Sequence, residues 1–216
     1  MRKKSTNLNF GAGVPLEGWI NLDASPLFFF PRIFHRVLHL LNLVKRSKFF
    51  LNSHYRYFVL NKENKLPLED NSINVIYCSH VLEHLHNENI QFLLDEFYRI
   101  LKPNGVVRIL VPDLENTFYQ ILKQDESSVD IGKKLGTLPI VLKHSRIVSA
   151  LEGLAGFPSI HKTMFLKNNL HKIEGQNWKL AGNLSYLKSN INPDILKSIE
   201  NIDRCTDALI FELIKK

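Results

Sequence analysis

A glycine-rich turn and the acid that follows it are the first residues in the chain that could bind a ligand. Leu8–Phe10 resemble the end of a short buried strand, which runs into Gly11-Ala12-Gly13. Glycine allows a sharp turn and a close approach to the backbone, because it has no Cβ. A second strand-like run, Trp19–Leu22, ends at Asp23. A carboxylate at the tip of one strand, beside a glycine turn at the tip of its neighbour, is how open α/β sheets hold ribose hydroxyls. The pattern predicts a nucleotide site, or else two strands joined by a loop that happens to contain glycine.

The spacing between this turn and its acid argues against a dinucleotide site. The G-x-G-x-x-G fingerprint places its acid about 20 residues on, after a whole helix. Val14–Gly18 is too short and too rich in Pro and Gly for a packed helix. A hairpin is the cheapest connection for so few residues, whereas a parallel pair needs an extended crossover at about 3.3 Å per residue. We therefore do not expect NAD to bind.

The elements that must position these residues alternate between strands and helices. Tyr55–Leu60 is predicted to be a third strand, and Ile73–Cys78 a buried fourth strand. Val106–Val111 is predicted to be a central fifth strand, because it is aliphatic apart from Arg108. Between the fourth and fifth strands, Asn87 is expected to cap a long helix that Lys102-Pro103-Asn104-Gly105 closes. Pro112-Asp113 then opens another helix at the carboxyl end of a strand. This alternation is typical of an α/β fold.

Residues 31–46 have the pattern of an inserted amphipathic, basic helix. Pro31 suits a first helical position, and the apolar residues Ile33, Val37, Leu40 and Val44 recur at helical spacing opposite Arg32, His35, Arg36 and His39. Such a helix could be a lid or a core-packing helix with a solvated basic face. Alternatively, residues 28–46 could lie on an anionic membrane surface, with the aromatic run before Pro31 inserted.

Composition and charge limit the class of protein. The chain has 216 residues, of which 44% are hydrophobic and 23% charged, as expected for one soluble globular domain. It has no apolar run long enough to span a membrane, and its basic start lacks the apolar stretch of a signal peptide. Cys78 and Cys205 occur in apolar, strand-like contexts without metal-ligand spacing, which indicates a reducing cytoplasm. The net charge of +7 favours an anionic partner: nucleic acid, a phospholipid surface or a phosphorylated substrate.

Three ordered motifs resemble a known family. LNFGAG…GWINLD, LPLEDNSINVIYCSHVLEHL and EFYRILKPNGVVRILVPDL are similar to S-adenosylmethionine-dependent class I methyltransferases. The closest resemblance is to a small bacterial subfamily with a shortened first helix, often associated with surface-polysaccharide synthesis. His161-Lys162-Thr163-Met164-Phe165 is similar to a later H-x-x-M-[YF] segment, and Ala208–Lys216 to the last strand. The resemblance implies one Rossmann-like domain over residues 1–216, with a seven-stranded, mostly parallel sheet, flanking helices, and segments 26–54 and 124–175 on the acceptor side.

The resemblance also implies a cofactor site and a parallel first crossover. The cofactor S-adenosyl-L-methionine would be bound by Gly11, Ala12, Gly13, Asp23, Asn61, Ser79 and His80. Asp23 would hold the ribose, and Gly11 and Gly13 would contact the methionine part. Asn61 stands where many relatives have an acid near the adenine, although an amide can still accept and donate hydrogen bonds. Asn74 likewise replaces an acid within the fourth strand and could be structural.

Methyl transfer from a sulfonium mainly requires alignment and desolvation. A hydroxyl acceptor also benefits from a general base, and histidine titrates near neutrality. The candidates are His80, His84 and His161. Alternatively, His80 could form part of the pocket wall, His84 could contact a neighbouring loop, and His161 could bind the acceptor. Asp113 could orient an acceptor or cap the next helix, and Glu83 is expected to be a surface or helix-start acid. The histidines show no ligand spacing with carboxylates, so no metal is predicted.

The residues after the fourth strand narrow the acceptor. Ser79-His80-Val81-Leu82 stands where amino-directed nucleic-acid methyltransferases have Asn/Asp-Pro-Pro-aromatic, which favours oxygen acceptors. We expect a hydroxyl of a sugar or glycolipid intermediate, methylated in the cytoplasm or at the inner membrane face. The alternatives are an RNA or ribonucleoprotein methyltransferase, suggested by the charge, and an inactive methyltransferase-like partner subunit, suggested by Asn61 and Asn74.

Overall fold

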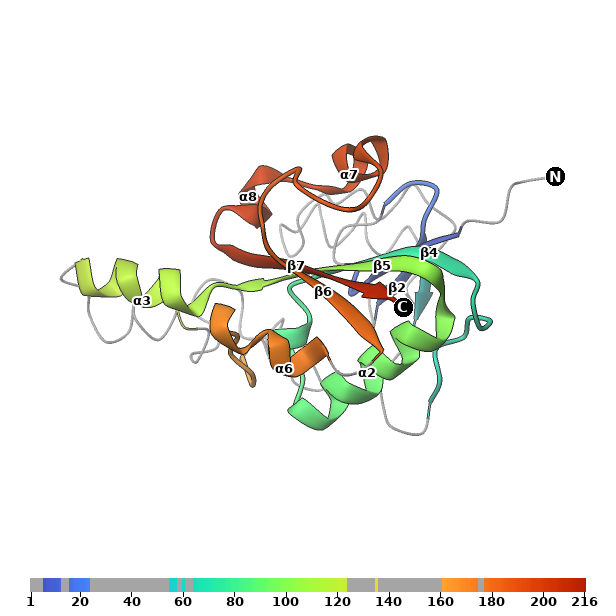
Figure 1. Ribbon diagram of the computed structural model, residues 1–216, viewed down its shortest axis with the longest axis horizontal. Coiled ribbons are helices and arrows are strands. Elements are labelled where there is room, and N and C mark those ends of the chain that lie inside the picture. Colours follow the sequence, from blue (N-terminus) through green and yellow to red (C-terminus); the bar gives the residue numbers. More distant parts are fainter. Residues whose placement is uncertain are drawn as a thin grey trace, which may run out of the picture.

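The fold is built on one mostly parallel β-sheet (Figure 1). The computed structural model describes residues 6–12, 16–23, 55–57, 60, 64–123, 135, 161–174 and 177–216. Seven strands lie in the order β3-β2-β1-β4-β5-β7-β6, and β7 alone runs in the direction opposite to the other six. Their bounds are β1 Asn7–Phe10, β2 Ile20–Asp23, β3 Tyr55–Tyr57, β4 Ile73–Ser79, β5 Leu101–Pro112, β6 Trp178–Leu184 and β7 Ala208–Lys215. The predicted α/β class with a mostly parallel sheet is therefore confirmed.

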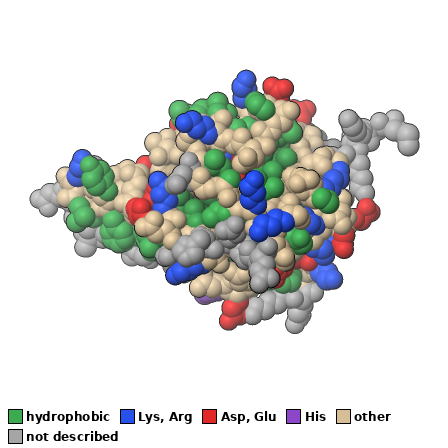
Figure 2. Space-filling model, in the orientation of Figure 1, with side chains coloured by type: hydrophobic (Ala, Val, Ile, Leu, Met, Phe, Trp, Pro, Cys, Tyr) green, Lys and Arg blue, Asp and Glu red, His purple; other side chains and the backbone are tan. Residues whose placement is uncertain are grey.

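Helices cover both faces of this sheet. Helix α2 (Asn87–Ile100) and the short α6 (His171–Glu174) lie on one face, and α7 (Pro193–Ile199) and α8 (Ile202–Cys205) lie on the other (Figure 1). Helix α3 (Leu114–Lys123) extends away from the sheet, and its side chains Phe118, Tyr119 and Leu122 are exposed. Figure 2 shows hydrophobic side chains on this projection, and Lys and Arg scattered over the rest of the visible face. The long helix begins one residue after its N-cap, His86, and not at a cap formed by Asn87.

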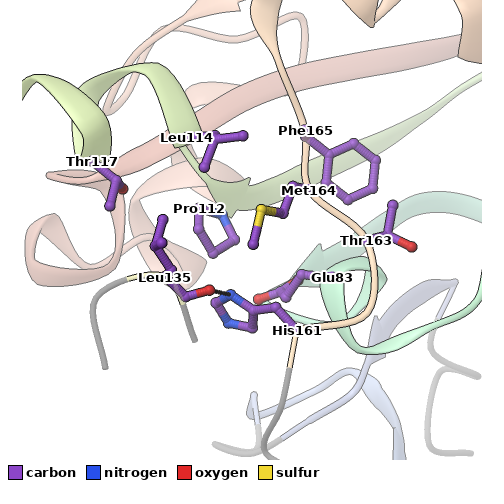
Figure 3. Close-up of a pocket in the computed structure, with 9 residues that line it drawn as sticks. All are labelled: Glu83, Pro112, Leu114, Thr117, Leu135, His161, Thr163, Met164 and Phe165. Atoms are coloured by element: carbon purple, nitrogen blue, oxygen red, sulfur yellow. Dashed lines mark hydrogen bonds between the residues drawn. The ribbon is translucent and has the colours of Figure 1, made fainter. Parts of the chain in front are cut away.

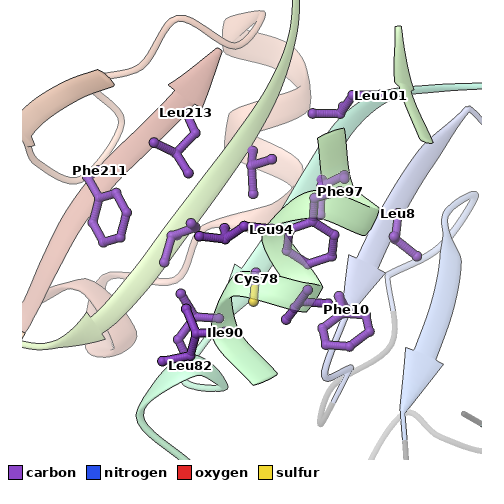
Figure 4. Packing of buried hydrophobic residues seen from close by; sticks show 14 of the residues in the cluster. Leu8, Phe10, Cys78, Leu82, Ile90, Leu94, Phe97, Leu101, Phe211 and Leu213 are labelled. Carbon is purple, nitrogen blue, oxygen red and sulfur yellow. The ribbon is translucent and has the colours of Figure 1, made fainter. Parts of the chain in front are cut away.

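The core has two parts, one on each face of the sheet. On the α2 face, Phe10 meets Phe97 edge to face, with ring centroids 5.3 Å apart, and Cys78 is buried beside Leu82 and Leu94 (Figure 4). The other face packs Tyr77 and Leu110 against residues of α7 and α8. Because β4 and β5 are covered on both faces, their sequences are nearly continuous apolar runs, as in other buried parallel strands.

The connection between β1 and β2 is a parallel crossover without a helix. Leu8 is in register with Ile20, and Phe10 with Leu22. The buried Asn21 side chain holds the connecting loop: its oxygen accepts from the Leu16 amide and from Asn9, at 2.9 Å each, and its amide donates to the carbonyls of Leu16 and Trp19. The hairpin that chain length alone favours is therefore wrong. The Asn21 side chain pairs the polar backbone groups of the loop, which in a crossover helix would pair with one another.

A fully buried arginine joins the central strands to the C-terminal helices. Arg108 of β5 faces Glu212 of β7 across the sheet and donates to it at 2.8 Å. Its Nε donates to Glu200, which follows α7, at 2.6 Å. The remaining guanidinium hydrogens reach the carbonyls of Lys188 and Ser185. The one charged residue in the predicted central strand is therefore an internal cross-link.

Several expectations fall on residues outside the described ranges. The amphipathic helix at 31–46, the whole of segment 26–54 and most of segment 124–175 are among them, as are Gly13 and Asn61. Of the predicted third strand, only Tyr55–Tyr57 is assigned as strand. Cys205 lies in a helix, not in a strand-like context, and both cysteines are free thiols whose pKa is raised by burial. No helix in the described part of the chain is long and apolar enough to cross a bilayer.

Candidate active site

The glycine turn and Asp23 meet at the carboxyl edge of the sheet. The strand order reverses between β1 and β4, and ligands of open α/β sheets bind beyond the strand ends at such a point. Gly11 has a φ of +69°, and its amide and that of Ala12 donate to the Leu22 carbonyl at 2.9 and 3.2 Å. These bonds hold the turn against the end of β2, where Asp23 is half-buried. The predicted neighbours Gly11, Ala12 and Asp23 are therefore brought together.

The segment after β4 packs directly on this turn. A Cβ built on Gly11 would come within 2.1 Å of a methyl of Val81, so a side chain larger than hydrogen does not fit there. Ser79 ends β4, and its buried hydroxyl has no hydrogen-bond partner among the described residues. His80 has a φ of +55°, a strained backbone for a non-glycine residue, and its amide is anchored to the Leu110 carbonyl at 2.9 Å.

Glu83 lies in the short 3-10 helix η3 (Leu82–His84) and is 1% exposed. Of the two expected positions, the surface is wrong, whereas the helix start is right, because Glu83 lies in the first turn of η3. Its carboxylate faces inward, and neither oxygen accepts a hydrogen bond from any described residue. His80 Nδ1 is 3.3 Å from Glu83 Oε1, and His84 Nε2 is 3.9 Å from the same oxygen. Both pairs count as ion pairs only when the imidazole is protonated.

The H-x-x-M-F segment is held against η3 by backbone hydrogen bonds. The amides of Lys162 and Thr163 donate to the Glu83 carbonyl at 2.7 and 3.1 Å, and the Thr163 hydroxyl donates to the Leu85 carbonyl. Phe165 forms a parallel bridge with Asp113. This docking places the His161 ring 5.2 Å from the His84 ring, although the two residues are far apart in the sequence.

Three histidines therefore surround one buried carboxylate. One donor atom from each of Glu83, His84 and His161 lies within 4.8 Å of the other two. The prediction that histidines and carboxylates do not group at ligand distance is wrong, because that grouping depends on tertiary docking. Burial lowers the pKa of His161 below its usual value, against the opposing effect of the Glu83 charge. His161 Nδ1 lies 3.1 Å from the Leu135 carbonyl, which favours a neutral ring with its proton on Nδ1.

A cavity of about 10 Å³ opens beside this cluster, between η3, the start of α3 and the H-x-x-M-F segment (Figure 3). Glu83 and His161 line its polar side, and Pro112, Leu114, Met164 and Phe165 line its apolar side. The volume is about that needed for one water molecule. Asp113 is not among the lining residues; its carboxylate accepts from the Asn116 amide at 3.1 Å, so it caps α3. Of its two predicted roles, the geometry favours the cap.

Asn74 has a structural role of the kind its position suggested. Its amide side chain donates to the Thr6 hydroxyl at 2.9 Å, and its backbone amide donates to the Thr6 carbonyl. It is exposed, at the irregular start of β4. The loss of an acid at this position therefore leaves the candidate site unchanged.

Comparisons with known proteins agree with this fold. Residues 38–109 match the model of a methyltransferase domain family. A chain in the complex between the Haloferax volcanii Trm112 methyltransferase activator and its assigned methyltransferase is 14% identical, with a TM-score of 0.50 over 99% of this chain and 83% of that one. The Pyrococcus horikoshii PH0226 protein is 13% identical, with a TM-score of 0.47 over 100% and 84%. A search of curated proteins found no significant match.

The family match supports an enzyme of the S-adenosylmethionine-dependent methyltransferase kind, while the solved structures show the fold alone. Its cofactor is S-adenosyl-L-methionine. The described residues fit this cofactor: the Gly11 turn brings backbone close to the sheet edge, Asp23 supplies a carboxylate, and the unpartnered Ser79 hydroxyl supplies a buried polar group.

Proposed function

We propose that the enzyme methylates a hydroxyl of a sugar or glycolipid intermediate, with His80 as the general base. The observation that carries this proposal is the convergence of three imidazoles on the buried Glu83 carboxylate, beside the Gly11 turn. A hydroxyl has to lose its proton as the new bond forms, and a histidine oriented by a carboxylate is suited to take it. An acceptor that is already nucleophilic would not need this arrangement.

His80 is the histidine best placed for this role. It directly follows β4, at the point where the strand order reverses, whereas His84 and His161 lie farther along η3 and the docked segment. When Nδ1 donates to Glu83, Nε2 keeps its lone pair and can accept a proton. Nε2 lies 3.4 Å from the Arg204 carbonyl, an acceptor that at this length would hold a proton on Nε2 only weakly. The strained backbone supports a functional role, because strain is retained where it positions a reacting group.

The cofactor supplies an electrophilic methyl group on a good leaving group. The chain's own part is to bind it and align the acceptor. We propose that Gly11, Ala12 and Gly13 approach it with backbone, and that Asp23 accepts hydrogen bonds from the ribose hydroxyls. Asn61 would contact the adenine, and Ser79 and His80 would form the wall nearest the methyl group.

Substitution of Asp23 tests the cofactor site. Asp23→Ala removes up to two charge-assisted hydrogen bonds, worth about 1.5–3 kcal/mol each, so calorimetry should show S-adenosylmethionine binding weakened at least tenfold. Glu17→Ala, an exposed acid in the crossover loop, is the matched control and should bind normally. Unchanged affinity in Asp23→Ala would overturn the site assignment.

The acceptor class is supported by the subfamily resemblance and by the residues after β4, which lack the motif of amino-directed enzymes. The test supplies labelled S-adenosylmethionine with two acceptor pools, lipid-linked oligosaccharides and total RNA. We expect label in the glycolipid pool, as an O-methyl sugar after hydrolysis. Label in the RNA pool, with salt-sensitive RNA retention, would favour the nucleic-acid alternative. Cofactor binding without label in either pool would favour an inactive partner subunit.

The His80→Ala variant tests the base. We expect its single-turnover rate to fall by about 10²–10⁴, with S-adenosylmethionine affinity within a factor of about three because the ribose contacts remain. His86→Ala removes an exposed histidine at the start of α2 and should leave the rate unchanged. A near-normal rate in His80→Ala would refute the role as base, and a loss of cofactor affinity without a loss of single-turnover rate would leave His80 a wall of the cofactor site only.

We also propose that residues 28–46 bring the enzyme to an anionic membrane surface. The support is the sequence pattern of aromatic residues before Pro31 and a basic face after it. The protein should co-sediment with anionic vesicles and be released as salt rises. Arg32→Glu with Arg36→Glu should abolish this without affecting cofactor binding. Equal recovery with neutral and anionic vesicles would favour a lid.

A further inference from the structure

The Glu83 carboxylate requires a positive or hydrogen-donating group that the described residues do not fully supply. Its side chain is 2% exposed, and among the described residues the nearest candidate donor is His80 Nδ1, 3.3 Å from Oε1 and outside good hydrogen-bond geometry. Burying an ionised carboxylate without compensation is so costly that such groups are normally paired, protonated or bound to a metal ion. The inward direction of Glu83 therefore indicates a ligand for this carboxylate.

The imidazoles of His84 and His161 lie close enough to Glu83 to share such a ligand with it. The nearest donor atoms of Glu83, His84 and His161 are mutually within 4.8 Å. His161 Nδ1 lies 3.1 Å from the Leu135 carbonyl, an acceptor that favours a proton on Nδ1 and a lone pair on Nε2. Histidines that bind metals almost always donate their other N–H to a carbonyl or carboxylate in this way.

We propose that Glu83, His84 and His161 bind a divalent transition-metal ion of the zinc type. Three protein ligands of two nitrogens and one oxygen, with a fourth position left open, are the donor set of catalytic zinc sites. Hard ions such as Mg²⁺ and Ca²⁺ prefer oxygen ligands, so this set discriminates against them. The site does not depend on the acceptor proposed above.

The distances are compatible with metal binding after a small closure. Ligand atoms around a tetrahedral ion at bond lengths of about 2.0–2.1 Å are roughly 3.4 Å apart, against the 4.8 Å limit here. The His84 side chain is 32% exposed and can move inward. The backbone bonds from Lys162 and Thr163 to the Glu83 carbonyl already fix the approach of the segment that carries His161.

The open position would face the cavity that Glu83 and His161 line. That cavity accommodates about one water-sized group, so a water molecule or a single hydroxyl could complete the coordination. If the acceptor is the hydroxyl proposed above, the ion would also stabilise its deprotonated form, and His80 would remain available to take the proton. This last consequence rests on the proposed function, whereas the binding of the ion does not.

The competing account is that a protonated His80, 3.3 Å from Glu83, compensates the carboxylate alone. Calorimetry with ZnCl₂ on the full chain, after removal of metals with a chelator, separates the two. We expect one Zn²⁺ per chain with a dissociation constant below about 1 μM. At a hundredfold excess over this constant, Zn²⁺ should raise the melting temperature by about 5–10 °C. Neither measurement requires S-adenosylmethionine or an acceptor, so a negative result here leaves the proposed function standing.

Three variants and two controls identify the ligands. His84→Gln, His161→Gln and Glu83→Gln should each weaken Zn²⁺ binding at least thirtyfold, since each removes one of three ligands. His80→Gln and His86→Gln should bind Zn²⁺ as the wild type does. Circular dichroism in the absence of metal checks that each variant is folded. The His84 substitution should disturb folding least, because its side chain is partly exposed.

Several results would overturn the site. They are the absence of one-to-one binding, binding that persists in His84→Gln and His161→Gln, and binding lost only in His80→Gln. Mg²⁺ binding as tight as Zn²⁺ binding would also contradict it, because the nitrogen ligands predict a preference of at least a hundredfold.

Discussion

Removing the buried Arg108 should destabilise the protein strongly. Arg108 and both of its carboxylate partners, Glu200 and Glu212, have fully buried side chains. Arg108→Met keeps most of the packed volume but leaves two buried carboxylates with no cation. Breaking a buried ion pair from one side costs about 3–5 kcal/mol. For a domain of this length that cost corresponds to a fall in melting temperature of about 6–20 °C.

The reasoning behind this magnitude can be checked by repairing the charge. Both carboxylates keep hydrogen-bond donors from the chain: Leu187 to Glu200, and Asn190 to Glu212. A glutamine oxygen can accept the same bonds, so Arg108→Met with Glu200→Gln and Glu212→Gln should recover more than half of the lost free energy of unfolding.

The assay is urea unfolding followed by circular dichroism, with the m-value compared between variants. Arg99→Met is a partial control, because the side chain of Arg99 is 19% exposed and, of its two carboxylate partners, Asp70 is 68% exposed and only Glu96 (6%) is buried. We expect a smaller loss there, about 1–2 kcal/mol. A loss below about 1 kcal/mol in Arg108→Met would refute the argument, since such values are typical of solvent-exposed pairs.

Three further predictions concern the sheet edge and its supports. Gly11→Ala should abolish cofactor binding and lower stability, because its φ of +69° and the Val81 methyl leave no room for a Cβ. The control Gly18→Ala, with open space around it, should lower stability by about 1–2 kcal/mol and leave cofactor binding unchanged. Asn21→Ala should cost about 2–4 kcal/mol in urea unfolding, because it leaves several loop groups unpaired. Glu96→Gln should be destabilising at pH 7 and progressively less so below about pH 4.3. Burial alone would raise the pKa of Glu96, but Arg99 and the Leu66 amide lower it overall, so its stabilising contribution is lost as pH falls through the folded-state pKa; an unchanged Glu96→Gln effect down to pH 3 would contradict this.

The parts of the fold that the sequence predicts well are those in which one segment carries its own signal. Helix α2 follows from apolar residues at helical spacing and from the turn that closes it, and β4 and β5 follow from continuous apolar runs. The sheet order does not follow from such local patterns, and the family resemblance supplied the expectation of parallel strands. Arg108 shows the limit: its place in an apolar strand was visible, but its partners on β7 and after α7 were not.

The crossover after β1 shows why local reasoning failed there. Chain length alone favours a hairpin, because a hairpin pairs the backbone of both strands at once. The parallel arrangement wins because Asn21 satisfies the loop's polar groups and because Trp19 is buried against the second part of the core. The bonds from Asn21 are local in the sequence, but the burial of Trp19 requires the finished sheet, so no short window of the sequence contains both effects.

The candidate site has the same origin. His80, His84 and His161 could be selected from the sequence because histidine suits proton transfer, and the structure brings all three to one place. Glu83 could not be selected in this way, because the residue looks like an ordinary acid at a helix start. What distinguishes it is burial, and that burial is completed when the segment around Thr163 docks onto η3 through the Glu83 carbonyl. The backbone bonds that dock this segment also bring His161 to the carboxylate. The same contacts therefore bury Glu83 and place a histidine beside it. A pattern such as H-V-L-E-H followed by a distant H-x-x-M-F therefore predicts a site only when the two segments are considered as a pair.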